Sequence, residues 1–122
     1  MAETLRKIPV IFYRSPSGAE TVLDWLRGLD QADRAIIGRD LMRVQFRWPV
    51  GMPICRPLGD GLWELRSTLE RGAAARLLFA PVRGTLLILH GFIKKTPKAP
   101  RRDIELARRR YREFEAGRDG AG

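Results

Sequence analysis

Three apolar segments, separated by short turns that contain glycine, occupy residues 62–95 and restrict the chain to few folds. They are 62–69, 75–82 and 85–95. Extended segments joined by such short turns pair as antiparallel hairpins. Pro81 limits the end of the second segment or marks a bulge, because proline donates no hydrogen bond to a neighbouring strand. The middle of the chain is therefore predicted to be an antiparallel meander.

The first of these strands alternates in polarity, which assigns its side chains to two faces. Trp63, Leu65 and Ser67 lie on one side. Glu64 and Arg66 lie on the other. An alternating strand of this kind packs one face on a core and leaves the other face free to be polar. We expect the polar face of the sheet to hold a basic cleft.

Two helices are predicted before the meander, after a short apolar strand at 8–13. Ser17 and Glu20 have the spacing of a capping box, which opens the first helix. Asp30 offers an N-cap for the second helix, whose apolar residues recur at helical spacing until about Arg47. A proline soon afterwards prevents the second helix from continuing.

A last helix is predicted after the proline-rich loop 96–100. Gly117 is expected to end it and to leave a frayed tail at 118–122. With a weak strand at 54–57, the order is strand, helix, helix, about four strands, helix. This order predicts a single α+β domain over 1–117, in which two N-terminal helices pack on an antiparallel sheet of four to five strands, with a C-terminal helix.

The charge of the chain is positive and unevenly distributed. Its 122 residues include 23 basic and 14 acidic side chains, which gives a formal net charge of +9. Residues 1–60 hold nine basic and seven acidic side chains, whereas 61–122 hold fourteen and seven. The distribution predicts a polyanionic partner that contacts the second half of the chain.

A single cysteine and a single histidine exclude several classes of protein. Cys55 has no second cysteine for an internal disulfide, as expected in a reducing cytosol. Cys55 and His90 alone cannot form a zinc site of the usual kind, so we expect neither a metal nor another cofactor. No segment approaches the ~18 consecutive apolar residues of a membrane span, and the start MAETLRK lacks the apolar centre of a signal peptide. We expect a cytoplasmic protein without a membrane partner.

The best candidate for chemistry is a pair of arginines on neighbouring predicted strands. The familiar phosphate-loop, nucleophile-elbow and zinc-protease motifs are absent from the sequence. Counting outwards from the turn near Gly72, Arg66 and Arg76 are close to cross-strand partners. Two guanidinium groups on one face repel each other unless an anion lies between them, and a phosphate accepts hydrogen bonds from both.

RNA strand cleavage is the reaction that this arrangement favours. The ribose 2′-OH would attack the adjoining phosphorus, and arginine would stabilise the charge that develops on the phosphoryl oxygens. Arginine is a poor proton acceptor, so the base would be Glu64, His90 or a lysine. Glu64 is the first candidate. Lys94 and Lys95 add positive charge, and the pattern does not decide which of them faces the cleft.

Each of these residues also has a structural alternative. Glu64 can form an ion pair with Arg66 or Arg76 without taking part in catalysis. His90 lies in an apolar strand and can be a hydrogen-bonded core residue, while catalysis by a Cys55–His90 pair stays open because distance in sequence does not decide contact. The arginines of the last helix can serve only to solvate one helix face.

Three motifs occur in order along the second half of the chain: GLWELR at 61–66, RLLF at 76–79 and GFIKKTPKAP at 91–100. In this combination the chain resembles the phage-derived HigB-like toxins of the RelE/ParE superfamily, which belong to type II toxin–antitoxin systems. The resemblance extends from the first strand into the last helix. It implies a RelE-like fold and the activity of an mRNA interferase, a metal-independent endoribonuclease that cuts translated mRNA at the ribosome.

The resemblance also implies which residues act on RNA. By position, Arg66 and Arg76 match the basic residues that contact and polarise the scissile phosphate. Lys94, Lys95 and Lys98 match the basic segment that leads into the last helix. With the net charge, this predicts an RNA-binding set made of Lys98, Arg101, Arg102, Arg108, Arg109 and Arg112.

The partners that the resemblance implies are mRNA, the ribosome and a cognate helix-turn-helix antitoxin of the HigA kind. The toxin would bind operator DNA only through its complex with the antitoxin. Two alternatives remain from the sequence: a ParE-like toxin that binds DNA gyrase, and an inactive phage-derived basic module that binds RNA or protein.

Overall fold

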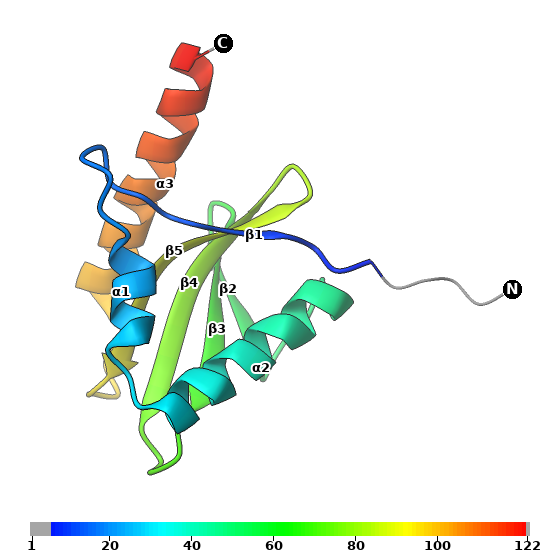
Figure 1. Ribbon diagram of the computed structural model, residues 1–122, viewed down its shortest axis with the longest axis vertical. Helices are drawn as coiled ribbons and strands as arrows, with labels where there is room; N and C mark the ends of the chain where they lie inside the picture. Colours follow the sequence, from blue (N-terminus) through cyan, green and yellow to red (C-terminus); the bar gives the residue numbers. More distant parts are fainter. Residues whose placement is uncertain (1–5, 122) are drawn as a thin grey trace, which may run out of the picture.

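The computed structural model describes residues 6–121, in which a five-stranded sheet is packed between helices (Figure 1). The strand order is β1-β5-β4-β3-β2. In chain order the elements are β1 (Val10–Phe12), α1 (Thr21–Arg27), α2 (Gln31–Arg47), β2 (Cys55–Gly59), β3 (Leu62–Thr68), β4 (Ala74–Val82), β5 (Thr85–Lys94) and α3 (Arg101–Ala121). The predicted α+β class and order of elements are confirmed.

The sheet is mixed, so the prediction of a purely antiparallel sheet was wrong for one pair of strands. β1 pairs with β5 in parallel, with Val10 opposite Leu86 and Phe12 opposite Ile88. The other three pairs are antiparallel. Hairpin turns fix the direction of β2 to β5, whereas β1 is separated from them by both N-terminal helices and no turn constrains its direction.

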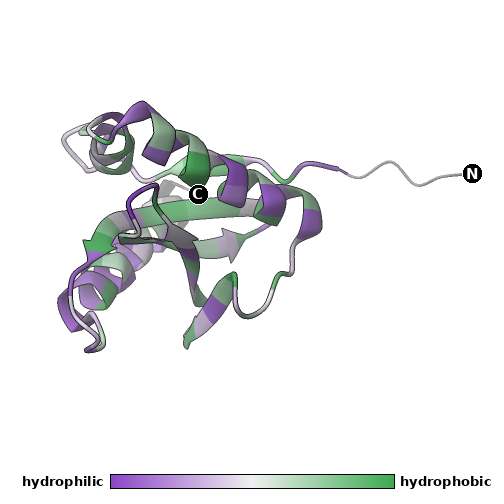
Figure 2. Cartoon of the chain, turned by 90° about the horizontal axis from the view of Figure 1, so that it is seen from below, coloured by the Kyte–Doolittle hydropathy of each residue, from purple (hydrophilic) through white to green (hydrophobic). Residues whose placement is uncertain are grey.

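Alternating side chains divide the core between the two faces of the sheet. On β4, Leu77 and Phe79 belong to the cluster that packs under α1 and α2, whereas Leu78 and Ala80 belong to the cluster under α3. Residues of α1 and α2 belong to the first cluster and Ala107 of α3 belongs to the second, so α3 lies on the opposite side of the sheet from α1 and α2 (Figure 2). The face that the sequence left polar is therefore partly covered by α3.

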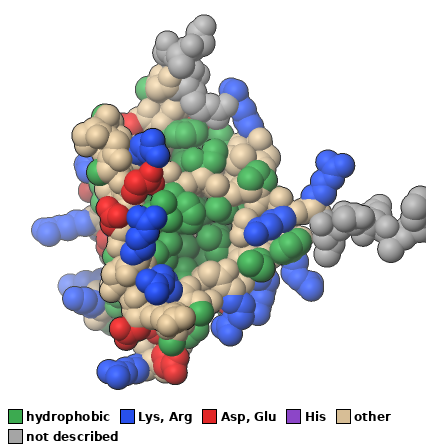
Figure 3. Space-filling view, viewed as in Figure 1, with side chains coloured by type: hydrophobic (Ala, Val, Ile, Leu, Met, Phe, Trp, Pro, Cys, Tyr) green, Lys and Arg blue, Asp and Glu red, His purple; other side chains and the backbone are tan. Residues whose placement is uncertain are grey.

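The face that carries α1 and α2 is apolar at its centre (Figure 3). Hydrophobic side chains are visible between the two helices, and lysine, arginine and acidic side chains border them. Three of the partly buried residues on this side are Trp25, Leu29 and Trp48. Trp48 packs edge-on against Trp63, with ring centroids 4.9 Å apart. The two N-terminal helices thus cover the larger of the two hydrophobic clusters.

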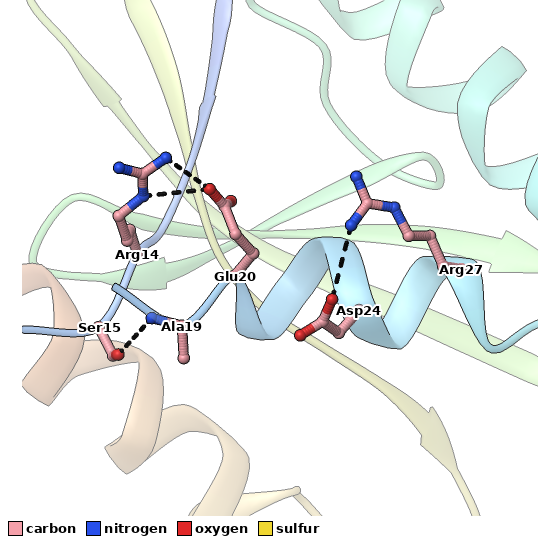
Figure 4. A network of polar contacts seen from close by, with 6 residues as sticks. All are labelled: Arg14, Ser15, Ala19, Glu20, Asp24 and Arg27. Carbon is pink, nitrogen blue, oxygen red and sulfur yellow. Dashed lines mark hydrogen bonds and ion pairs between the residues drawn. The ribbon is translucent and has the colours of Figure 1, made fainter. Parts of the chain in front are cut away.

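The start of α1 differs from the predicted capping box (Figure 4). Ser15 Oγ accepts a hydrogen bond from the Ala19 backbone N–H at 2.9 Å, and Ser17 caps no helical N–H. Glu20 is the N-cap residue, and its carboxylate binds the Arg14 guanidinium at 2.6 Å. An ion pair with Arg14, in the loop after β1, has replaced the reciprocal cap, and α1 starts only at Thr21.

Helix α3 is held over one end of the second face by polar contacts. Arg108 donates hydrogen bonds to the backbone oxygens of Leu58 at 2.8 Å and Gly59 at 3.2 Å. Arg110 donates to the Leu89 oxygen at 2.8 Å. Ala107, on the apolar stripe of α3, is fully buried. These contacts place α3 over the end of the sheet that contains the β2–β3 and β4–β5 turns.

The prediction that Gly117 ends the last helix was wrong, because α3 continues to Ala121. A C-terminal stop by glycine requires a left-handed backbone, and Gly117 is not among the glycines with positive φ. Glycine within a helix costs only about 1 kcal/mol, which the neighbouring helical residues offset. Gly122 lies outside the described residues. No helix in the described part of the chain combines the length and apolar character that crossing a membrane requires.

Candidate functional site

The end of the second face that α3 leaves uncovered carries a row of polar side chains. Arg66 of β3 lies opposite Arg76 of β4, as the hairpin spacing predicted. Glu64 lies two residues along β3 on the same face, opposite Leu78, which pairs in turn with His90. Three neighbouring strands therefore bring their charged side chains to one surface. We call this surface the open face.

Glu64 lies between the two arginines. Its Oε1 is 3.9 Å from Nε of Arg66 and 3.8 Å from Nε of Arg76. Glu64 is only 4% exposed, so its carboxylate has little contact with water. The two guanidinium groups are the charges that compensate for this burial. A buried carboxylate is tolerated when it is paired in this way. Glu64 holds the two positive groups together on the sheet.

Arg76 is buried and incompletely bonded. It is 7% exposed, and its Nη1 donates to the Ala75 carbonyl at 2.9 Å. Its Nε has no hydrogen-bond partner among the described residues. Burial lowers the pKa of the Arg76 guanidinium, and while Glu64 opposes this shift, Arg66 adds to it. Arginine nevertheless stays protonated in proteins, so Arg76 is a buried cation on the open face.

A hollow adjoins the arginine pair. Its volume is about 350 Å³, which lies within the range of small-ligand sites. Its lining residues are Pro53, Ile54, Arg66, Thr68, Ala74 and Arg76. Both guanidinium groups of the open face therefore border a space that can admit a phosphate group and part of a nucleotide.

His90 lies on the open face and has a carboxylate partner that the sequence did not reveal. Its Nε2 is 2.7 Å from Oδ1 of Asp103, in the first turn of α3. The His90 side chain is 17% exposed and that of Asp103 is 33% exposed. His90 is therefore not a fully buried core histidine, and it is not isolated. Its partly exposed imidazole can take part in proton transfer, and Asp103 fixes the orientation of the ring. In the sequence, Asp103 was distinguished only as an acidic residue in the first turn of an arginine-rich helix.

The structure distinguishes Lys94 from Lys95. Lys94 pairs with Ala74, which shares the face of Arg76, whereas Lys95 follows the end of β5. A bulge between Leu78 and Phe79 of β4 adds an unpaired residue, Leu89, to β5. Alternation along β5 changes phase at this bulge, which explains why the sequence pattern could not assign a face to the two lysines.

The predicted RNA-binding residues separate into two groups. Lys98, Arg101 and Arg102 line a hollow of about 710 Å³ at the loop before α3, close to Lys94 and Lys95. Arg108 is at the opposite end of the sheet, where its guanidinium is already bound to the β2–β3 turn. Arg112 lines a small hollow beside Arg108, and Arg109 is exposed on α3.

A Cys55–His90 catalytic pair is excluded by the fold. Cys55 belongs to the core cluster under α1 and α2 and is 0% exposed. His90 lies on the other face of the sheet, opposite Leu78. Burial raises the pKa of the Cys55 thiol to about 11, which keeps it neutral and unreactive. In the described part of the chain, no three histidine, cysteine, aspartate or glutamate side chains lie close enough to hold a metal ion.

The fold and its open face define a small basic α+β protein with a partly buried, cationic surface on its sheet. The chain belongs to the family of phage-derived Gp49-like proteins (DUF891), whose model matches residues 24–112. The match begins in α1 and extends into α3, so it includes every residue of the open face. A comparison with curated proteins found no match for the chain.

Proposed function

We propose that this protein is the toxin of a type II toxin–antitoxin system, of the RelE/HigB-like kind, and that it acts as an mRNA interferase. Membership of the phage-derived Gp49-like family supports a toxin. The observation that carries the nuclease proposal is that the guanidinium groups of Arg66 and Arg76 lie on opposite positions of neighbouring strands and border one hollow. A scissile phosphate would satisfy both guanidinium groups.

The proposed reaction is transfer of the phosphoryl group to the neighbouring ribose oxygen. The bond from 2′-O to phosphorus forms, and the bond from phosphorus to 5′-O breaks. The products are a 2′,3′-cyclic phosphate and a 5′-hydroxyl end. Arg66 and Arg76 bind the phosphoryl oxygens and stabilise their charge in the transition state. Lys94 adds positive charge from the neighbouring strand.

One group must take the 2′-OH proton and one must deliver a proton to the 5′-oxygen. We assign removal of the 2′-OH proton to His90, because its imidazole is partly exposed and Asp103 orients it at 2.7 Å. Water supplies the proton to the leaving 5′-oxygen. Glu64, the base predicted from the sequence, is the alternative. Its carboxylate is nearly inaccessible and is shared by two guanidinium groups, an arrangement that favours positioning over proton transfer.

The experiment is cleavage of a reporter mRNA by the purified protein, with and without translating ribosomes, mapped by primer extension. We expect cuts that disappear in the Arg66→Ala/Arg76→Ala variant. A matched control is Arg27→Ala/Arg43→Ala, which removes two exposed arginines from the helices of the opposite face. Intact mRNA in both conditions with folded protein would refute the nuclease, and DNA damage in arrested cells would then indicate a gyrase-binding toxin.

The two candidates for the base are separated by single variants in the same assay. His90→Gln keeps hydrogen bonding to Asp103 but cannot exchange a proton. Glu64→Gln keeps the shape but loses the charge between the arginines. If His90 transfers the proton, His90→Gln abolishes the pH dependence of the single-turnover rate, whereas Glu64→Gln lowers the rate and retains that dependence. The reverse result would assign the base to Glu64.

The proposal includes the partners that the resemblance implies. A cognate helix-turn-helix antitoxin would neutralise the toxin, and only their complex would bind operator DNA. Expression of the chain with and without the neighbouring reading frame tests this part. We expect growth arrest without the neighbouring gene and normal growth with it.

A further inference from the structure

We propose that Phe92 is a platform on which the base of the bound nucleotide stacks, beside the phosphate held by Arg66 and Arg76. This inference rests on the proposed function, because it requires a phosphate on the arginine pair. It adds a base-binding subsite and makes single-stranded nucleic acid with an unstacked base the preferred ligand.

The position of Phe92 on the sheet places its ring next to the arginine pair. Phe92 of β5 lies opposite Arg76 of β4, and Arg76 lies opposite Arg66 of β3. Side chains directly opposite on antiparallel strands have Cβ atoms only about 5 Å apart. All three side chains point to the open face. A base attached to a phosphate on Arg76 is therefore within reach of the Phe92 ring.

The surroundings of Phe92 are unusual for a core aromatic residue. Its ring is partly exposed and stacks on His90, with centroids 5.5 Å apart and planes 17° from parallel. It also borders a hollow of about 260 Å³, where its neighbours include Lys94, Lys95 and Lys98. By contrast, Phe79 on the same sheet is fully buried. Phe92 also packs against the hydrophobic cluster under α3, so one part of its ring is in the core and another part borders the lysine-lined hollow.

An aromatic ring among cations is the combination that single-stranded nucleic acids require. Lysine and arginine side chains bind the phosphates along the strand, and an aromatic side chain stacks on a base of any identity. In a duplex both faces of each base are already stacked, so Phe92 would select an unpaired segment. Phe92 lies opposite Arg76, and its ring stacks on His90, so stacking would also hold the attached ribose near the group that we assign to proton transfer.

Binding of two short oligonucleotides tests the inference without depending on cleavage. One is a fluorescent single-stranded DNA hexanucleotide, which lacks the 2′-OH and cannot be cut. The other has the same phosphates but abasic sugars at every position. We expect Phe92→Leu to bind the DNA hexanucleotide about tenfold more weakly than wild type. It should bind the abasic oligonucleotide with the same affinity as wild type. Phe92→Tyr, which keeps the ring, should bind both normally.

Two results would overturn the stacking platform. Equal losses for both oligonucleotides in Phe92→Leu would show that the ring only supports the cationic surface. No loss for either would show that the ring contacts no base. Thermal unfolding of both Phe92 variants verifies that they fold. A separate measurement tests the phosphate site on which the inference rests. If Arg66→Ala/Arg76→Ala binds the abasic oligonucleotide as tightly as wild type, the two arginines do not bind phosphate.

Discussion

At the scale of single residues, Arg76 combines two properties that rarely occur together. It is a charged side chain with 7% exposure, and its buried Nε makes no hydrogen bond within the described structure. Burying a charge is unfavourable unless an opposite charge and hydrogen bonds compensate for it. Glu64 supplies part of that compensation at 3.8 Å. The guanidinium group also borders the hollow that it shares with Arg66.

Replacing Arg76 should therefore affect catalysis more than binding. We expect Arg76→Ala to lower the single-turnover rate of cleavage by about 10²-fold or more, as for loss of an oxyanion donor. Single-turnover kinetics on a saturating reporter RNA measure this effect. Arg43→Ala, an exposed arginine on α2, is the matched control and should cleave normally. A rate within twofold of wild type for Arg76→Ala would contradict the role of the arginine pair.

Cys55 should make stability depend on pH in the alkaline range. Burial raises the pKa of its thiol from 9.0 to about 11. Because the folded-state pKa is the higher one, the neutral thiol contributes stability that is fully present below pH 9 and is lost as the pH rises through about 11. We expect a loss of up to about 3 kcal/mol. Denaturant unfolding between these pH values measures it, and the Cys55→Ala variant should lose correspondingly less. Parallel pH curves for the two proteins would be inconsistent with this effect.

At the scale of elements, helix α3 decides how much of the second face is open. Its arginines differ in role although they are adjacent in sequence. Arg108 binds two backbone oxygens and the Asp60 carboxylate at 3.2 Å or less. Arg109 is exposed on the same helix. The sequence grouped both with the RNA-binding residues, since a helix pattern alone does not show which side chain reaches the β2–β3 turn.

This difference predicts opposite effects of two alanine substitutions. Arg108→Ala should lower the free energy of unfolding by about 1–2 kcal/mol, because hydrogen bonds to a charged group are lost. Arg109→Ala should leave stability unchanged and weaken RNA binding, with the salt slope reduced by about one unit. Denaturant unfolding and binding titrations at several salt concentrations measure both. If Arg109→Ala were the destabilising variant, the assigned anchor of α3 would be wrong.

The contact between α1 and β5 depends on Gly91, the first residue of the GFIKKTPKAP motif. A Cβ atom at Gly91 would lie 2.4 Å from Cε3 of Trp25 and 3.1 Å from Cδ2 of Leu77. The absence of a side chain there makes room for the indole ring. Gly91 is thus a packing residue of the opposite face, although it lies between His90 and Phe92 in the sequence.

Gly91→Ala should consequently destabilise the fold. We expect a loss of about 1–3 kcal/mol, the usual cost of overpacking a core, measured by thermal or denaturant unfolding. Gly38→Ala is the control, because Gly38 lies in α2 with nothing within 4 Å of an added Cβ. That variant should gain up to about 1 kcal/mol from better helix propensity. Equal stability of the Gly91 and Gly38 variants would show that Trp25 moves aside without cost.

At the scale of the whole molecule, the two faces of the sheet differ in chemistry. The face under α1 and α2 has an apolar centre (Figure 3). The open face carries the arginine pair and the lysines of β5 and its following loop. The net charge of +9 favours binding of nucleic acid in general, but the proposed contacts with the scissile phosphate belong only to the open face.

Salt dependence can locate the RNA on the molecule. Each phosphate contact of a single strand contributes about −0.7 to the slope of log K against log salt concentration. Arg101→Ala/Arg102→Ala, beside the open face, should reduce the magnitude of the slope by about 1.4. Arg39→Ala/Arg43→Ala, on the opposite side, should leave it unchanged. Titration of an uncleavable oligonucleotide measures both, and equal slopes for the two variants would indicate diffuse binding.

The sequence by itself determined the features that depend on neighbouring residues. Polarity alternation in β3 put Glu64 and Arg66 on one face, because successive side chains of a strand point in opposite directions. Short turns fixed the hairpin registers, so the pairing of Arg66 with Arg76 could be counted from the turn. Net charge predicted an anionic partner. All of these inferences need only the geometry of an extended chain and of tight turns.

Only the tertiary structure decided the features that depend on contacts between distant segments. The bulge in the β4–β5 pair set the face of Lys94 and brought Phe92 beside Arg76. The packing of α3 brought Asp103 to His90 and left part of the second face uncovered. Where α3 lies depends on which apolar patch of the assembled sheet its narrow stripe can bury, and that patch does not exist until the strands have paired.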